Sequence, residues 1–473
     1  MIFLPHIYLL LIWIRSLSHS ALERYSPLRG FDFGNFKPIW ETDASFTIQI
    51  LLIYGIFLFL VHIRPFDFIS VTHRQKQERF PLRLKIMKGG RKILRLCFWG
   101  MAAQPFLYLF RLYQYPLYSI SDKKMWVLLL VADGALTFLF FYLLVLNGSI
   151  RILCTCRSLG VWKRVLFFCF LWIPVVHLFP LKYLSKRAKI ELDAEICRFE
   201  NHKKRDGAMI CATKYPILLL HGIGFRDLQY FNYWGRIPKE LVRNGALVYY
   251  GHQEAWGTIE NNGQVIREKI KEVLAQNHCS KVNIIAHSKG GLDARYLISG
   301  LHMEEQVASL TTISTPHRGS ELLDILNRLP DGIYHFISSL FDKSYARFGD
   351  LNPDCYHASK QLSRTYCQTF NAKYPDSPKV YYQSYASYVK HPFGDPMLGI
   401  PNLLMYLSGA SKNDGLVNIT SAKWGHFKKT FVSTGSRGIS HGDMIDLKRE
   451  DYKGFDVIEA YVKIVAELKD MGF

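Results

Sequence analysis

Long apolar runs with few charges dominate the first 205 residues, and shorter apolar segments replace them from about residue 208 onward. A helix needs about 20 apolar residues to cross a hydrocarbon layer roughly 30 Å thick. Three runs approach that length, at 46–63, 125–147 and 165–181. Two weaker runs, at 2–14 and 96–110, could also be spans, and we leave them open. The pattern predicts an α-helical transmembrane domain over residues 1–205.

The second half of the chain alternates short buried strands with helices. Strand-like runs lie at 216–220, 246–250, 282–286 and 309–314, and helical periodicity lies at 259–275 and 291–299. This order is typical of βαβ units, which form a mostly parallel sheet with helices on both faces. We therefore expect residues 208–473 to form a domain of the α/β class.

The formal charge of +20 raises the question of a nucleic-acid partner. The basic residues instead concentrate beside apolar runs, between Arg64 and Arg95 and between Lys182 and Arg205. Such flanks are typical of the cytoplasmic side of a membrane, and no nucleic-acid-binding motif accompanies them. We expect a multi-pass membrane protein whose C-terminal domain faces the cytoplasm. If 2–14 and 96–110 also cross, that domain lies on the other side.

The most informative motif is the break of the strand 282–286 at Ser288. The string AHSKGG places this serine among small residues, between a strand and a helix. That layout is typical of a nucleophile elbow, whose strained turn presents the hydroxyl above the sheet. Ala286 stands where the motif usually has its first glycine. The motif predicts Ser288 as a nucleophile.

A serine nucleophile needs a histidine base and an orienting carboxylate. Asp414 lies in an Asn-Asp-Gly turn, and His441 lies in a loop before the last helix. Each feature is common alone, but the order serine, aspartate, histidine is that of the α/β hydrolases. The set predicts a triad of Ser288, Asp414 and His441.

The run 216–220 ends at His221-Gly222, at the carboxyl edge of the sheet where Ser288 is also expected. Backbone N–H groups of Ile223 and Lys289 are the predicted oxyanion hole. His221 and Gly222 are expected at the substrate site, with His221 shaping its loop and carrying no proton.

Residues 213–470 resemble the bacterial triacylglycerol lipases. Four strings carry the resemblance: YPILLLHGIG from Tyr215, VNIIAHSKGGLDARY from Val282, TTISTPHRGS from Thr311 and NDGLV from Asn413. The resemblance implies an α/β-hydrolase fold, a lipid ester substrate and the same triad. It also implies a structural calcium near the catalytic histidine, held by Asp395 and Asp443. No organic cofactor is expected.

Apolar residues at helical spacing fill the segment 321–350. Its place after a strand end suits a lid over the active site, which would open at a lipid surface. The alternative is a pair of ordinary core helices in a cap domain.

These features predict a membrane-anchored serine hydrolase that cleaves carboxylic esters of lipids through an acyl-enzyme. A lipid acyltransferase or a phospholipase would use the same triad. A membrane scaffold with an inactive hydrolase domain is the alternative from another class, and the complete triad argues against it.

Overall fold

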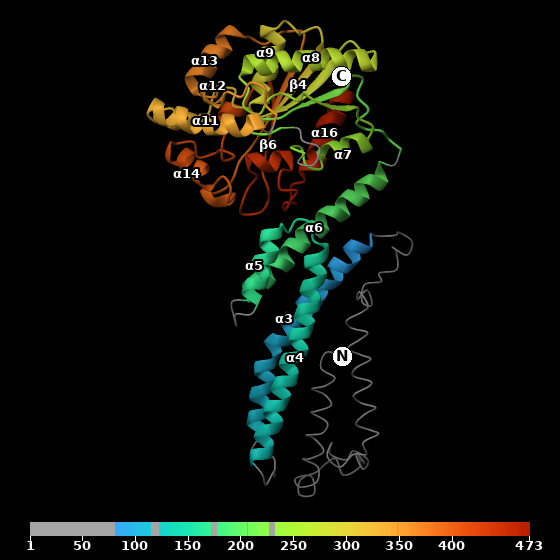
Figure 1. The fold of residues 1–473 in the computed structure, drawn as a ribbon. Helices are drawn as coiled ribbons and strands as arrows, with labels where there is room; N and C mark the ends of the chain where they lie inside the picture. Colours follow the sequence, from blue (N-terminus) through green and yellow to red (C-terminus); the bar gives the residue numbers. More distant parts are fainter. Residues whose placement is uncertain (1–80, 115–122, 172–176, 206, 227–231, 348) are drawn as a thin grey trace. The chain divides into compact units, whose positions relative to one another are not determined.

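The computed structural model describes residues 81–114, 123–171, 177–205, 207–226, 232–347 and 349–473 (Figure 1). Contacts divide the chain into two units, residues 1–192 and 193–473. The boundary falls inside helix α6 (Leu178–Lys204), earlier than the predicted one near residue 205.

The first unit contains, in its described part, α3 (Leu82–Gln114), α4 (Lys123–Thr155), α5 (Val161–Leu171) and the start of α6. Helices α3 and α4 touch at Gly90 and Gly148, where a Cβ on Gly90 would come 2.8 Å from the Gly148 carbonyl oxygen. Buried Glu191 of α6 accepts a hydrogen bond from the Ser158 backbone N–H (2.9 Å) and pairs with Arg83 of α3. Glycines and one buried carboxylate therefore hold these helices together.

Among the described residues, no helix has the length and apolarity that would let it cross a bilayer. The predicted spans 125–147 and 165–181 and the weaker run 96–110 are therefore not supported. The run 165–181 is also not one described helix, because α5 ends at Leu171 and α6 begins at Leu178. The runs 2–14 and 46–63 lie outside the described residues.

The second unit is built on a parallel sheet, which confirms the predicted α/β class. In the described residues its strand order is β2-β1-β3-β4-β5-β6, and every neighbouring pair is parallel. The strands are β1 (Ile217–Leu220), β2 (Val248–Tyr250), β3 (Val282–His287), β4 (Val307–Ile313), β5 (Tyr381–Ser387) and β6 (His426–Phe431).

Alternate residues of β1 face two separate hydrophobic cores. Ile217 and Leu219 pack with α7 (Ile237–Arg243) and α16 (Val457–Asp470), whereas Leu218 and Leu220 pack with α8 (Ile259–Asn277) and α9 (Gly290–Gly300). Successive strand residues point to opposite faces, so a run that is apolar throughout requires helices on both sides. Figure 1 shows the two helix layers on either side of the sheet.

The remaining elements are inserted after β4, β5 and β6. Helices α10 (Glu321–Leu326), α11 (Asp331–Arg347), α12 (Cys355–Lys360) and α13 (Arg364–Lys373) follow β4, whereas η3 (Pro392–Gly394), α14 (Gly399–Leu407) and α15 (Ile419–Ala422) follow β5. The short helix η4 (His441–Ile445) follows β6. Since the strands are parallel, the segments that follow them begin at one edge of the sheet.

The last turns of α6 belong to the second unit and are fixed there by Arg198. Its Nε donates to Asp456 Oδ2 at 2.6 Å, and the guanidinium also pairs with Asp451. Arg198 is 7% exposed and Asp451 is 3% exposed. Removing one partner of a buried ion pair leaves the other charge unpaired in a poorly solvated place.

We expect Arg198→Ala to destabilise the second unit by roughly 3 kcal/mol. The fall should appear as a lower midpoint of thermal unfolding followed by tryptophan fluorescence, since Trp234 is fully buried in this unit. Arg267→Ala is the control, because Arg267 pairs with Glu268 on the surface of α8. An equal midpoint for both variants would contradict a structural role for Arg198.

Candidate active site

Ser288 sits in a strained turn between β3 and α9. Its backbone φ is 55°, a left-handed value that non-glycine residues rarely adopt. The turn needs small neighbours, because a Cβ on Gly290 would come 2.5 Å from the His221 carbonyl oxygen and a Cβ on Gly291 would come 2.2 Å from Thr315 Oγ1. Ala286 is buried one residue before the end of β3. The backbone has the form of a nucleophile elbow.

Asp414 and His441 form a buried pair. His441 Nδ1 lies 2.8 Å from Asp414 Oδ2, and the His441 backbone N–H donates to the Asp414 carbonyl oxygen at 2.9 Å. The other carboxylate oxygen accepts from the backbone N–H groups of Leu416 (3.1 Å) and Val417 (2.8 Å). An Nδ1–H that donates to a fixed carboxylate leaves Nε2 as the basic nitrogen of His441.

The elbow and the Asp–His pair come together through His287, the residue before Ser288. The rings of His287 and His441 lie 4.4 Å apart between centroids. Within the described residues, no hydrogen bond joins Ser288 to the His441 ring. Catalytic hydrogen bonds of this kind often form fully only when substrate is bound.

The loop after β1 presses directly on Ser288. A Cβ on Gly222 would come 2.8 Å from Ser288 Cβ. The N–H groups of Gly222 and Gly224 donate to Tyr233 Oη (3.0 Å) and to the Ala255 carbonyl oxygen (2.9 Å). The Ile223 N–H between them makes no hydrogen bond to any described residue, and it therefore has the freedom that an oxyanion-hole donor needs.

Lys289 contributes only its backbone at this edge. Its side chain is buried, and Nζ lies 2.5 Å from Asp293 Oδ1. Its N–H, like that of Ile223, has no hydrogen-bond partner among the described residues. Lys289 follows Ser288 in the chain, and Ile223 follows Gly222, the residue whose added Cβ would touch Ser288.

His221 is buried, and its two ring nitrogens face backbone carbonyl oxygens of Gly222 (2.8 Å) and Gln253 (2.9 Å). Its side chain is therefore committed to the loop and is not presented to a substrate. Gly222 has no side chain, and this lets the loop after β1 lie against Ser288.

Tyr233 is a residue that the sequence motifs did not indicate. Its hydroxyl accepts from the Gly222 N–H and lies 2.6 Å from His287 Nδ1. Burial lowers the pKa of His287 well below its ordinary value, and the neighbouring His441 lowers it further. A neutral His287 can accept at Nδ1, so one chain of hydrogen bonds runs from Gly222 through Tyr233 to His287.

Asp395 and Asp443, the expected calcium ligands, lie close enough to share Arg437. Its Nη2 donates to Asp395 Oδ2 (3.0 Å) and to Asp443 Oδ1 (3.1 Å), and its Nη1 lies 2.7 Å from Asp443 Oδ2. Lys448 pairs with the remaining oxygen, Asp395 Oδ1. Burial raises the pKa of Asp395, but hydrogen bonds from Lys448 and Ser440 and the nearby cations hold it below its ordinary value.

Calcium binds through several oxygen ligands that are free of other cations. Here each oxygen of Asp395 and Asp443 already contacts a cationic side chain of this chain. Among the described residues there is also no group of three or more histidine, cysteine or acidic side chains arranged for a metal. The residues present do not fit a calcium ion.

The predicted lid segment contains α10 and α11. The last turns of α11 contact the loop after β1 and Trp256. Tyr345 Oη donates to the Gly224 carbonyl oxygen (2.6 Å), and the centroids of the Phe341 and Trp256 rings lie 5.4 Å apart. Only Tyr334 and Ser338 of α11 are buried. Its apolar residues do not form a core, and five are more than a third exposed: Ile333, Phe336, Ile337, Leu340 and Phe341.

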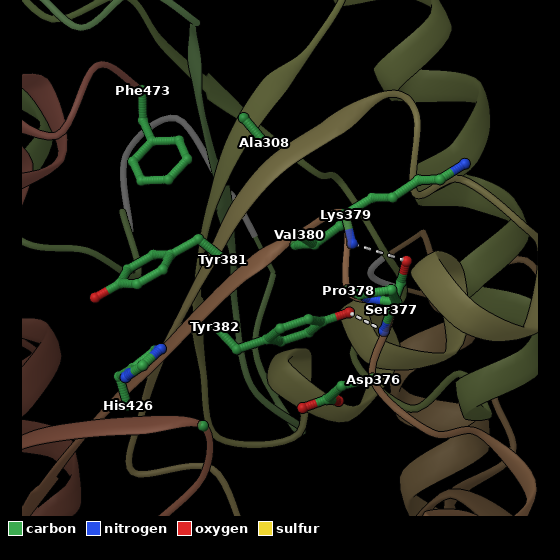
Figure 2. Close-up of a pocket in the computed structure, with 11 residues that line it drawn as sticks. Ala308, Asp376, Ser377, Pro378, Lys379, Val380, Tyr381, Tyr382, His426 and Phe473 are labelled. Carbon is green, nitrogen blue, oxygen red and sulfur yellow. Dashed lines mark hydrogen bonds between the residues drawn. The ribbon is translucent and has the colours of Figure 1, made fainter.

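A hollow of ≈ 570 Å³ at the opposite edge of the sheet is separate from this site (Figure 2). Ala308, Tyr381 and His426 line it at the starts of β4, β5 and β6, together with Phe473. Ser288 follows the end of β3, so this hollow lies at the amino edge of the sheet and the elbow lies at the carboxyl edge.

Several known proteins that are similar to this chain are named triacylglycerol lipases. Triacylglycerol lipase 2 of Saccharomyces cerevisiae is 32% identical over 53% of this chain and 77% of its own length. The triacylglycerol lipase of Pseudarthrobacter phenanthrenivorans is 31% identical over 35% of this chain and 56% of its own length. That of Pseudomonas fragi is 27% identical over 55% of this chain and 98% of its own length. No family model matches the chain.

Solved structures with a similar chain path include the mature lipase BlEst2 of Bacillus licheniformis, which is 19% identical with a TM-score of 0.40 and covers 54% of this chain and 92% of its own. The metagenomic carboxyl esterase MGS0156 is 15% identical with a TM-score of 0.43 and covers 54% of this chain and 76% of its own.

Tyr233→Phe should slow the reaction of Ser288 with a fluorophosphonate probe by about tenfold, because losing a buried hydroxyl that serves two partners releases the oxyanion loop. The measurement is the second-order rate constant of labelling. Tyr461→Phe is the matched control: Tyr461 is also fully buried beside Trp234, and its hydroxyl has no hydrogen-bond partner among the described residues. Equal rates for the two variants would refute the role of Tyr233.

Proposed function

The chain belongs to the triacylglycerol lipase family, and from that premise we propose that it is a carboxylic ester hydrolase that cleaves lipid esters with Ser288 as nucleophile. The observation that carries this proposal is the buried Asp414–His441 pair beside a strained elbow serine. Asp414 fixes the His441 tautomer that carries its proton on Nδ1. The free Nε2 can then take the proton of a serine nucleophile.

The reaction begins when His441 Nε2 takes the proton of the Ser288 hydroxyl as its oxygen attacks the ester carbonyl carbon. The negative charge on the former carbonyl oxygen is stabilised by the N–H groups of Ile223 and Lys289. His441 then protonates the leaving alcohol, and an acyl-enzyme remains. Water then attacks this ester as His441 takes one of its protons. His441 returns that proton to the departing Ser288 oxygen, which releases the fatty acid and restores the free serine.

A lipid substrate is supported by the exposed apolar side chains of α11 and α14. The residues on α11 recur at spacings of three and four, which places them on one helix face. In and beside α14, the side chains of Met397, Ile400 and Leu407 are 68%, 72% and 73% exposed. Large apolar groups that are exposed together mark a surface that contacts lipid or protein. We propose that this surface contacts the substrate aggregate and that α10 and α11 form the lid.

Membrane anchoring is part of the proposal only through the run 46–63, which lies outside the described residues. Its apolar composition and the basic residues that follow it support an anchor with a cytoplasmic flank.

Ser288→Ala should lower ester hydrolysis by at least about 10³-fold, because only binding and oxyanion stabilisation remain. Labelling by a fluorophosphonate probe should also disappear. Ser299→Ala serves as the control, since Ser299 is a helix residue whose hydroxyl donates to the Pro375 carbonyl oxygen.

If wild-type protein resists the probe, the scaffold interpretation gains support. If it is labelled but transfers acyl groups to an added alcohol faster than to water, acyl transfer is favoured.

Replacing Phe336 and Leu340 together by serine should lower hydrolysis of emulsified long-chain triacylglycerol by about tenfold or more, since each side chain contributes roughly 1.5–3 kcal/mol when it leaves water. Hydrolysis of a soluble short-chain ester should stay within about twofold, because the chemical groups are unchanged. Val242→Ser with Leu247→Ser is the control: both side chains are more than half exposed and lie outside α11 and α14. A similar loss in the control would remove the special role of α11.

A further inference from the structure

The pair Asp395 and Asp443 is electrically balanced by the chain itself. Two carboxylates carry two negative charges, and Arg437 and Lys448 carry two positive charges. A divalent cation would supply the same total charge. Both aspartates are nearly inaccessible, at 2% and 0% exposed, so an unpaired carboxylate here would be strongly destabilising.

This cluster supports the turn that carries His441. Ser440 caps η4: its backbone N–H donates to Asp443 Oδ2 (2.8 Å), and its hydroxyl donates to Asp395 Oδ2 (2.5 Å). His441 is the next residue. Tyr452 Oη donates to Asp443 Oδ1 (2.6 Å) and holds that carboxylate from a third segment.

Arg437 links this turn to the loop around η3. Besides its two carboxylate partners, its Nε donates to the Gly394 carbonyl oxygen, and its own carbonyl oxygen accepts from the Lys390 N–H (2.9 Å). A planar guanidinium can serve several acceptors in fixed directions, as a metal ion does with its ligands. Arg437 thus joins the loop around η3, which follows β5, to the turn that carries His441.

We propose that Arg437, together with Lys448, takes the place of a structural divalent cation and positions His441, so that this chain works without calcium. The inference rests on the proposed function, in which His441 is the general base. It makes Arg437 a positioning residue that acts through Ser440 and Asp443 and does not touch the substrate.

The test compares the full-length wild type, Arg437→Ala and Arg437→Lys in the presence of a calcium chelator and of millimolar calcium. The wild type should show the same unfolding midpoint and the same kcat in both conditions. Arg437→Ala should lose roughly 10- to 100-fold in kcat, with KM of a soluble ester within about threefold, as is usual when a group that orients an active-site ligand is removed. Calcium should then raise both the midpoint and kcat of Arg437→Ala, because the vacated space between two carboxylates suits that ion.

Arg437→Lys should keep the charge but lose the fork of donors, and its kcat should lie between those of the other two proteins. Arg267→Ala, on the surface of α8, is the control and should respond to neither condition. A chelator-dependent midpoint of the wild type would overturn the proposal, as would an Arg437→Ala defect that calcium does not reverse. These midpoints do not depend on ester hydrolysis. If wild-type protein has no esterase activity yet its midpoint ignores the chelator, the proposed function fails and the metal-independent cluster stands.

Discussion

The left-handed backbone of Ser288 is the constraint around which the site is arranged. A residue other than glycine in this conformation has an unfavourable energy of about 1–3 kcal/mol, so the surroundings must hold it. The Ser288 N–H donates to the Ile313 carbonyl oxygen of β4 (3.0 Å), which fixes the end of β3 in the sheet. Gly290 and Gly291 let the next turn pack against the loop after β1 and against Thr315. The same close packing brings Gly222, the residue before Ile223, against Ser288.

The turn that carries His441 is held by charge, because η4 is too short to be stabilised by its own backbone hydrogen bonds. On one side, Arg437 pairs with Asp395 and Asp443. On the other side, Arg236 donates to both carboxylate oxygens of Asp446 at 2.8 Å, and Asp446 has a left-handed φ of 55° at the end of η4. Two arginines from distant segments thus fix both ends of one turn, and the imidazole between them needs only Asp414 to set its orientation.

Of the four strands predicted from the sequence, β1, β3 and β4 are buried throughout, whereas β2 at the edge of the sheet is half-buried. The run Ile217–Leu220 is apolar throughout, and the run 282–286 is apolar except for Asn283, so their place in a parallel sheet could be inferred. Strands β5 and β6 were not predicted from hydropathy alone. In β5, buried Gln383 donates to Thr311 Oγ1 (2.8 Å), and this polar pairing hides the strand from a hydrophobic pattern. Strand β6 lies at the edge of the sheet and is largely exposed.

The residues of the site that belong to a motif or follow the family's chain order could be predicted from the sequence. Residues whose role depends on contact between distant segments could not. Ser288, Asp414 and His441 could be ordered from the sequence, and the structure brings the aspartate and histidine together. The two aspartates that the resemblance assigned to calcium pair with one arginine, Arg437. Their partner Arg437 has no motif, because its role comes from the meeting of two loops.

The contact between α11 and the loop after β1 bears on how the proposed lid would act on the proposed active site. Tyr345 near the end of α11 donates to the Gly224 carbonyl oxygen, and Gly224 in turn donates to Ala255. Asp350, just beyond the helix, accepts from the backbone N–H groups of Ala255 (3.3 Å) and Trp256 (3.2 Å). If α11 moves as the proposed lid, a shift of Tyr345 must either carry Gly224 with it or break this hydrogen bond. In the proposed function Ile223, the residue before Gly224, is an oxyanion-hole donor. If a lipid surface draws the apolar face of α11 outward, either outcome would then act on that donor.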